Sequence, residues 1–210
     1  MNDRKNGKWI ISISLCILIS GCTWNPPEGY TEKHHSYEEL VEYARSIDPD
    51  ATVSDDPEDV KDDYWEYRIY PAVINGMECS VASTSDVVYD SLGEFGKIYY
   101  KMDTDYDYYI ISDVLNDYPE LGTIYDDSES MRFQVNDVIV SGIEVDSITQ
   151  DELDELWDAY KRINSELEQY DLRKTIWLKI AFPDGDSYFK ETSEQYYQNM
   201  IGRLKENGKL

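Results

Sequence analysis

Three aspartates alternate with other residues in the run Asp103-Thr-Asp105-Tyr-Asp107. Alternating carboxylates can begin a calcium-binding loop, in which a glycine makes the sharp turn and a later glutamate binds the ion through both oxygens. Here Tyr108 stands in the place of the glycine and Val114 in the place of the glutamate. The run Asp184-Gly-Asp186 is a similarly incomplete pattern. We therefore expect no bound metal at either run, and no cofactor.

Nucleophilic catalysis by serine or cysteine needs a positioned histidine as its base. The chain has two histidines, the adjacent His34 and His35, and we expect both to lie in solvent in a linker. Neighbouring side chains on an extended segment point apart, and no third ligand follows at a fixed spacing, so a metal site there is not expected. The sequence also lacks the Gly-x-Ser-x-Gly, His-Glu-x-x-His, Walker and Gly-x-Gly-x-x-Gly motifs.

Two carboxylates on opposite sides of a glycosidic bond can hydrolyse it. The chain has 44 acidic residues, and nothing in the sequence singles out one pair of them. Its 19 tyrosines and five tryptophans could stack on sugars, but aromatic residues at strand and helix spacings are more often part of a core. We therefore assign no catalytic residue and do not expect an enzyme.

The first 22 residues have the order of a secretory signal peptide. Three basic residues precede an apolar run at 10–20 of about 11 residues, too short for the ~20 that span a bilayer. The sequence Leu18-Ile19-Ser20-Gly21-Cys22 then resembles the lipobox of bacterial lipoproteins. That resemblance implies cleavage before Cys22, a diacylglyceryl group on its thiol, and a protein anchored to the bacterial cell membrane on its extracytoplasmic side.

The lipobox divides the chain into a signal peptide at 1–21, a tether at 22–35 and one folded domain at 36–207. The expected signal peptide contains Cys16, and the resemblance implies a lipid on Cys22, so Cys79 would be the one free thiol. No intramolecular disulfide is then available, and the hydrophobic core must hold the fold. A lone cysteine among alternating apolar residues is most often a small buried side chain.

The chain is strongly acidic, with a net charge of −25. Loss of residues 1–21 removes three basic residues and one acid, which leaves −27. Such a charge repels nucleic acid and attracts basic proteins. The segment 54–63, with six acids, is expected to be an exposed loop and a contact for such a partner. We expect a monomer.

The remaining pattern predicts an α+β fold, a mainly antiparallel sheet with about four helices packed on one face. Capping boxes begin two helices, Ser36-Tyr-Glu-Glu39 and Thr149-Gln-Asp-Glu152, and Asn75-Gly76 predicts a hairpin turn. The expected helices are 37–47, 105–117, 150–170 and 193–207. The expected strands are 64–73, 77–84, 96–102, 121–125, 131–140, 175–182 and 186–190.

These observations favour a membrane-anchored, non-catalytic domain that binds another protein. Two alternatives stay open. The first is a module that binds carbohydrate or peptide on an aromatic patch, and the second, less favoured, is a glycoside hydrolase that uses two carboxylates. No binding residue is assigned apart from Cys22 as the site of lipidation.

Overall fold

The computed structural model describes residues 26–61, 65–89, 96–126, 128, 132, 133 and 136–210. The fold is α+β, with four α-helices and mainly antiparallel sheets in the described residues, as the sequence predicts. The helices are α2 (Tyr37–Ile47), α3 (Tyr106–Leu115), α4 (Gln150–Leu167) and α5 (Glu194–Glu206), with a 3-10 turn η1 (Pro119–Leu121). The strands are β1 (Thr52–Val53), β2 (Glu58–Lys61), β3 (Glu66–Ile74), β4 (Met77–Tyr89), β5 (Gly96–Thr104), β6 (Thr123–Ile124), β7 (Asp137–Glu144), β8 (Thr175–Phe182) and β9 (Gly185–Phe189).

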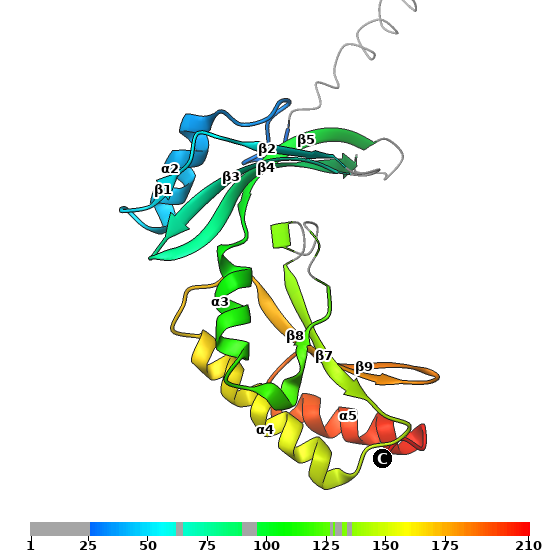
Figure 1. Cartoon of the computed structure of the whole chain (residues 1–210). Coiled ribbons are helices and arrows are strands. Elements are labelled where there is room, and N and C mark those ends of the chain that lie inside the picture. The colour runs from blue at the N-terminus through cyan, green and yellow to red at the C-terminus, as the bar shows by residue number, and fades with distance from the viewer. Residues whose placement is uncertain (1–25, 62–64, 90–95, 127, 129–131, 134–135) are drawn as a thin grey trace, which may run out of the picture.

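The first sheet has the order β1-β3-β4-β5, with β2 also paired to β3. The hairpin of β3 and β4 turns at Asn75 and Gly76, whose φ angles of 50° and 78° are those of the predicted turn. Helix α2 covers one face of this sheet (Figure 1). It begins with the predicted capping box, in which Ser36 and Glu39 each accept a hydrogen bond from the other's main-chain N–H.

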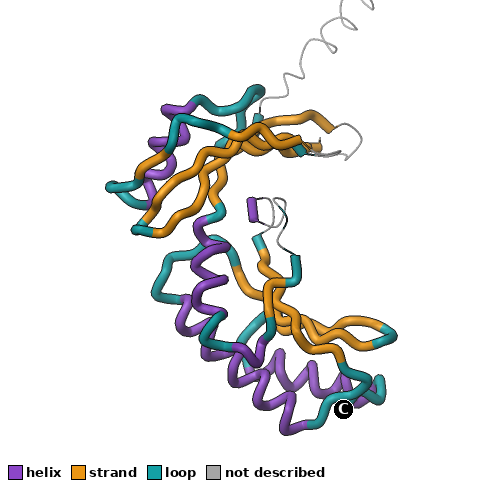
Figure 2. Tube along the Cα trace, in the orientation of Figure 1, coloured by secondary structure: helices purple, strands orange, loops and turns teal. Residues whose placement is uncertain are grey.

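The second sheet has the order β6-β7-β8-β9. Strands β7 and β8 run parallel and are joined through α4, whereas the other pairs of this sheet are antiparallel. Helices α4 and α5 lie together on one side of the sheet, as the purple and orange segments of Figure 2 show. The sheet buries Val138, Val140, Ile176, Leu178 and Phe189 toward the core.

Aromatic rings join the two helices to the second sheet. The rings of Trp157 on α4 and Tyr197 on α5 stack with centroids 4.8 Å apart and an interplanar angle of 5°. Phe189 of β9 lies 5.3 Å from Trp157. The buried residues of this region belong to one continuous core that also includes Leu40 and Ala44 of α2, so the two sheets share a hydrophobic interior.

Three local expectations are wrong. The segment 54–63 is not all loop, because residues 58–61 form the edge strand β2, in which Asp59 binds Arg68 at 2.7 Å. The strand expected at 131–140 begins at Asp137, and residues 132 and 133 are helical. Neither histidine is solvated as expected. His35 is buried, and its main-chain N–H binds the hydroxyl of Ser83 on the interior strand β4 at 3.0 Å. His34 is partly buried, with its ring centroid 4.1 Å from that of Tyr100.

The lipobox lies outside the described residues, so the predicted lipidation of Cys22 has no structural counterpart. The end of the expected tether contacts the first sheet, since Thr31 forms a β-bridge with Tyr100. Among the residues that the structure describes, no helix combines the length and the apolar character that crossing a membrane requires.

Candidate functional site

The three alternating aspartates lie where β5 passes into α3, and each has a different partner. Asp103 accepts a hydrogen bond of 2.8 Å from the N–H of Thr104, and Asp105 accepts one of 2.6 Å from the N–H of Ser80. Asp107 accepts one of 2.8 Å from the N–H of Arg173. The carboxylates therefore tie β4, α3 and the segment before β8 together. Among the described residues, histidine, cysteine, aspartate and glutamate form no group of three that could hold a metal ion.

Cations from the segment before β8 balance these aspartates. The guanidinium of Arg173 lies 3.6 Å from Asp103 and 3.4 Å from Asp107, and it also binds the hydroxyl of Tyr43 on α2. Burial raises the pKa of Asp103 and raises the pKa of Asp105 to about 6. Burial lowers the pKa of Lys174 in the same region. This cluster joins the two halves of the molecule, with its aspartates buried and Arg173 exposed.

Cys79 is buried in the core on β4, as expected of a lone thiol. Burial and the nearby carboxylate of Asp105 raise its pKa to about 12. The thiolate is the nucleophilic form of cysteine, so burial and the raised pKa both disfavour a nucleophilic role for Cys79.

A groove with a volume of about 920 Å³ lies beside α4. We call it the α4 groove. Its helical wall presents residues three or four apart, which share one face of α4. The opposite wall comes from the end of β7, the segment that leads into α4, and η1. Its lining consists of Glu120, Ile143, Val145, Ile148, Glu152, Glu155, Leu156, Asp158, Lys161, Arg162 and Ser165.

The apolar part of the α4 groove is formed by Ile143, Val145, Ile148 and Leu156. Ile148 and Leu156 are buried, whereas Ile143 and Val145 are partly exposed. Hydrogen bonds fix the wall: Val145 donates to the carbonyl of Ala181 at 3.1 Å, and Ile148 to that of Lys209 at 2.8 Å. These two hydrogen bonds hold the apolar wall of the groove in position.

A close contact between two glycines positions this wall. The pairing of β7 with β8 shifts by one residue between Ser141 and Ile143, which forms a bulge at Gly142. A Cβ on Gly142 would lie 2.5 Å from the Cα of Gly122, which follows η1 and has a φ of 88°. Only glycines allow η1 to approach β7 this closely, and this approach places Glu120 opposite Arg162.

Acidic side chains line the rim of the α4 groove. Asp158 pairs with Lys161 at 2.8 Å, and Glu120 with Arg162 at 2.9 Å. Glu152 belongs to the capping box of α4, and the hydrogen bond from the N–H of Thr149 lowers its pKa. Glu155 has no ion-pair partner among the described residues. The rim therefore carries unneutralised negative charge at the N-terminal end of α4.

Sequence reasoning did not identify this groove. The apolar stripe of α4 was visible, but residues 143–148 belong to no predicted element, and the glycine contact joins segments 20 residues apart. The acidic segment that the sequence favoured as a contact lies on the first sheet at β2, away from the groove-forming elements α4, η1 and β7.

Comparisons with known proteins found no matching protein-family model, no matching curated protein and no matching solved structure.

Proposed function

We propose that this protein is a lipoprotein anchored to the extracytoplasmic side of a bacterial membrane through Cys22, and that its folded part binds another protein without catalysis. The single observation that carries the binding role is the α4 groove, with its apolar floor and acidic rim. The lipobox at 18–22 supports the anchor, because two acyl chains hold a protein stably on a membrane.

The groove favours one kind of occupant, an amphipathic segment that presents apolar side chains to the floor and basic ones to the rim. Its volume falls within the ~300–1,000 Å³ of typical ligand sites. Four acids and two basic residues line it, and both basic residues are paired with acids. The exposed acids Asp151 and Asp154 extend the negative surface at the same end of α4. A basic segment therefore gains attraction at the rim and apolar burial at the floor.

A calorimetric titration tests this occupant with a 14-residue helical peptide made of leucine and lysine. Glu155→Lys reverses a charge on the rim, and Glu42→Lys makes the same change at an exposed position of α2 on the first sheet. We expect Glu155→Lys to weaken binding at least fivefold more than Glu42→Lys does.

A second peptide, with serine in place of leucine, tests the apolar floor and should bind at least tenfold more weakly. Equal affinities of the two lysine variants would contradict the groove as the binding site. Equal affinities of the two peptides would show that net charge alone holds them, and would also contradict the proposal.

A further inference from the structure

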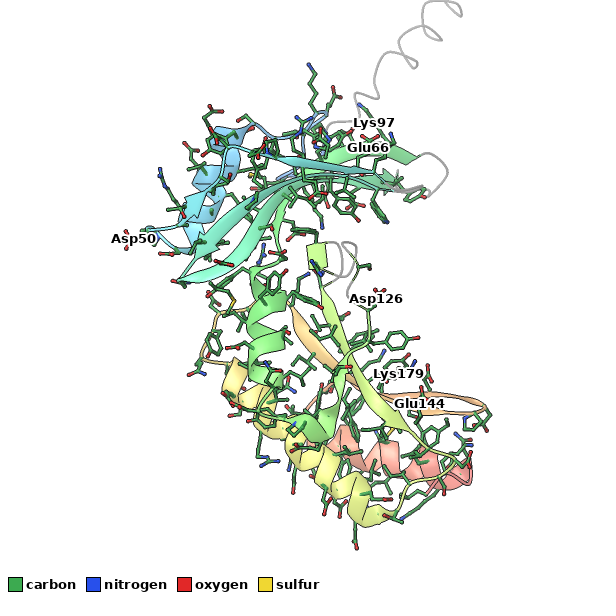
Figure 3. The ribbon with its side chains drawn as sticks, viewed as in Figure 1. Asp50, Glu66, Lys97, Asp126, Glu144 and Lys179 are labelled. Carbon is green, nitrogen blue, oxygen red and sulfur yellow. The ribbon has the colours of Figure 1, made fainter. Side chains whose placement is uncertain are left out.

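A second surface, unrelated to the α4 groove, lies on the side of the second sheet that faces away from α4 and α5. Strand residues alternate between the two sides of a sheet. On β8, Ile176 and Leu178 are buried in the core, so Trp177 and Lys179 project from the opposite side. Figure 3 shows Lys179 on this side.

One row of side chains crosses this side of the sheet, with Tyr125 directly after β6, Ile139 on β7, Trp177 on β8 and Lys190 directly after β9. The N–H of Tyr125 binds the carbonyl of Ile139 at 2.8 Å, and Ile139 is the register partner of Trp177. Phe189 is the register partner of Leu178, so Lys190, the next residue in the chain, lies beside Trp177. The ammonium of Lys190 lies 3.7 Å from the centre of the Trp177 ring. With strands ~4.8 Å apart, the row is about 14 Å long.

Polar groups lie beside these rings. Tyr188 is the register partner of Lys179, and its ring meets that of Trp177 edge to face at 6.3 Å. The ammonium of Lys179 lies 4.0 Å from the centre of the Tyr125 ring and 3.1 Å from the carboxylate of Asp186. Asp186 also accepts a hydrogen bond of 3.3 Å from the hydroxyl of Tyr188. Hydrogen-bond donors and one carboxylate acceptor therefore lie beside the aromatic rings, and the faces of these rings attract positive charge.

We propose that this aromatic face binds an uncharged glycan. The C–H bonds on the flat side of a sugar ring carry partial positive charge, so they are attracted to the negative faces of Trp177 and Tyr125. The two ammonium groups each cover one face of these rings, and the sugar would stack on the other face. The exposed ammonium of Lys190 donates hydrogen bonds to some sugar hydroxyls, and the exposed carboxylate of Asp186 accepts hydrogen bonds from others. An acidic polymer is disfavoured because the whole chain carries a charge of −25.

Exposed tyrosines provide a matched pair of variants. Tyr125 is 61% exposed and Tyr89, on the first sheet, is 62% exposed, so replacing either by alanine removes little packing. The full-length protein in detergent is titrated calorimetrically with cellohexaose, chitohexaose, mannohexaose and, as an acidic polymer, polygalacturonate. At least one neutral oligosaccharide should bind. Trp177→Ala and Tyr125→Ala should each weaken that binding at least fivefold, whereas Tyr89→Ala should leave it unchanged.

Absence of binding by all three neutral oligosaccharides would overturn the proposal, and so would binding of polygalacturonate alone. Equal effects of Tyr125→Ala and Tyr89→Ala would also overturn it, because the bound glycan would then lie elsewhere.

Discussion

The main-chain N–H of Arg173 donates a hydrogen bond of 2.8 Å to Oδ2 of Asp107, 66 residues earlier in the chain. The Nε of the same arginine lies 3.4 Å from that oxygen, and its Nη1 donates to the hydroxyl of Tyr43. One carboxylate on α3 thereby fixes the segment that leads into β8, and the arginine extends from there to α2. The connection between the two sheets therefore depends on the ion pair of buried Asp107 with exposed Arg173 as well as on the shared core.

Replacing Asp107 by alanine should destabilise the fold by about 2–3 kcal/mol, because the Arg173 N–H and guanidinium lose a charged acceptor. Asp113→Ala is the matched control, since Asp113 is an exposed aspartate on the same helix, and it should change the free energy of unfolding by less than about 0.5 kcal/mol. Urea unfolding followed by circular dichroism measures both. Equal losses of unfolding free energy in the two variants would show that the contacts of Asp107 with Arg173 do not stabilise the fold.

Asp105 should make stability depend on pH. Burial raises its pKa from 3.8 to about 6 in the folded protein. The folded state therefore binds its proton more tightly than the unfolded state, and this stabilisation is complete below pH 3.8 and lost as pH rises through 6. Relative to Asp105→Asn, the wild type should lose about 2–3 kcal/mol between pH 4 and 7.5. If the free energy of unfolding changes with pH equally in the wild type and in Asp105→Asn, Asp105 is not the source of the pH dependence.

The contact between Gly122 and Gly142 should tolerate no side chain. Gly142→Ala places a Cβ 2.5 Å from the backbone of Gly122, and we expect a loss of about 1–3 kcal/mol from the forced displacement. Gly202→Ala is the contrasting control, because Gly202 lies in α5 with no heavy atom within 4 Å of an added Cβ. That change should stabilise the protein by about 0.5–1 kcal/mol. Thermal unfolding distinguishes the two, and a neutral Gly142→Ala would show that the wall of the groove can shift.

Replacing Cys22 by alanine should release the protein from the membrane fraction or block its processing, because the acylated thiol is lost. Fractionation of the producing cells followed by immunoblotting measures the shift. Cys79→Ala is the control for loss of a cysteine elsewhere and should leave the distribution unchanged. Mass spectrometry that finds an unmodified Cys22 in membrane-bound native protein would exclude the lipid anchor.

The sequence predicts the elements better than their arrangement. Local signals were sufficient for α2 and α4, since a capping box is complete within four residues. They were also sufficient for the turn at Asn75 and Gly76, whose positive φ angles follow from residue type. The buried state of His35 depends on Ser83, 48 residues away, and no local pattern contains that contact.

The candidate sites depend on long-range pairing that the sequence does not reveal. The aspartates of 103–107 were visible as a group, but their partners Ser80 and Arg173 come from other parts of the chain. The α4 groove needs the bulge at Gly142 and its contact with Gly122, which arise only when β7 and η1 meet. The aromatic face needs the register of four strands, whereas the sequence predicts only that Trp177 and Lys179 share a side of one of them.

The most direct test of the binding role is photo-crosslinking from inside the α4 groove in the cells that produce the protein. A photoreactive amino acid replaces Ser165, an exposed residue of the groove lining, in the lipidated full-length chain, and position 42 on α2 serves as the control site. We predict a covalent adduct from position 165, absent from position 42, whose crosslinked segment contains apolar and basic residues at helical spacing. No adduct from position 165, or the same adducts from both positions, would contradict the account.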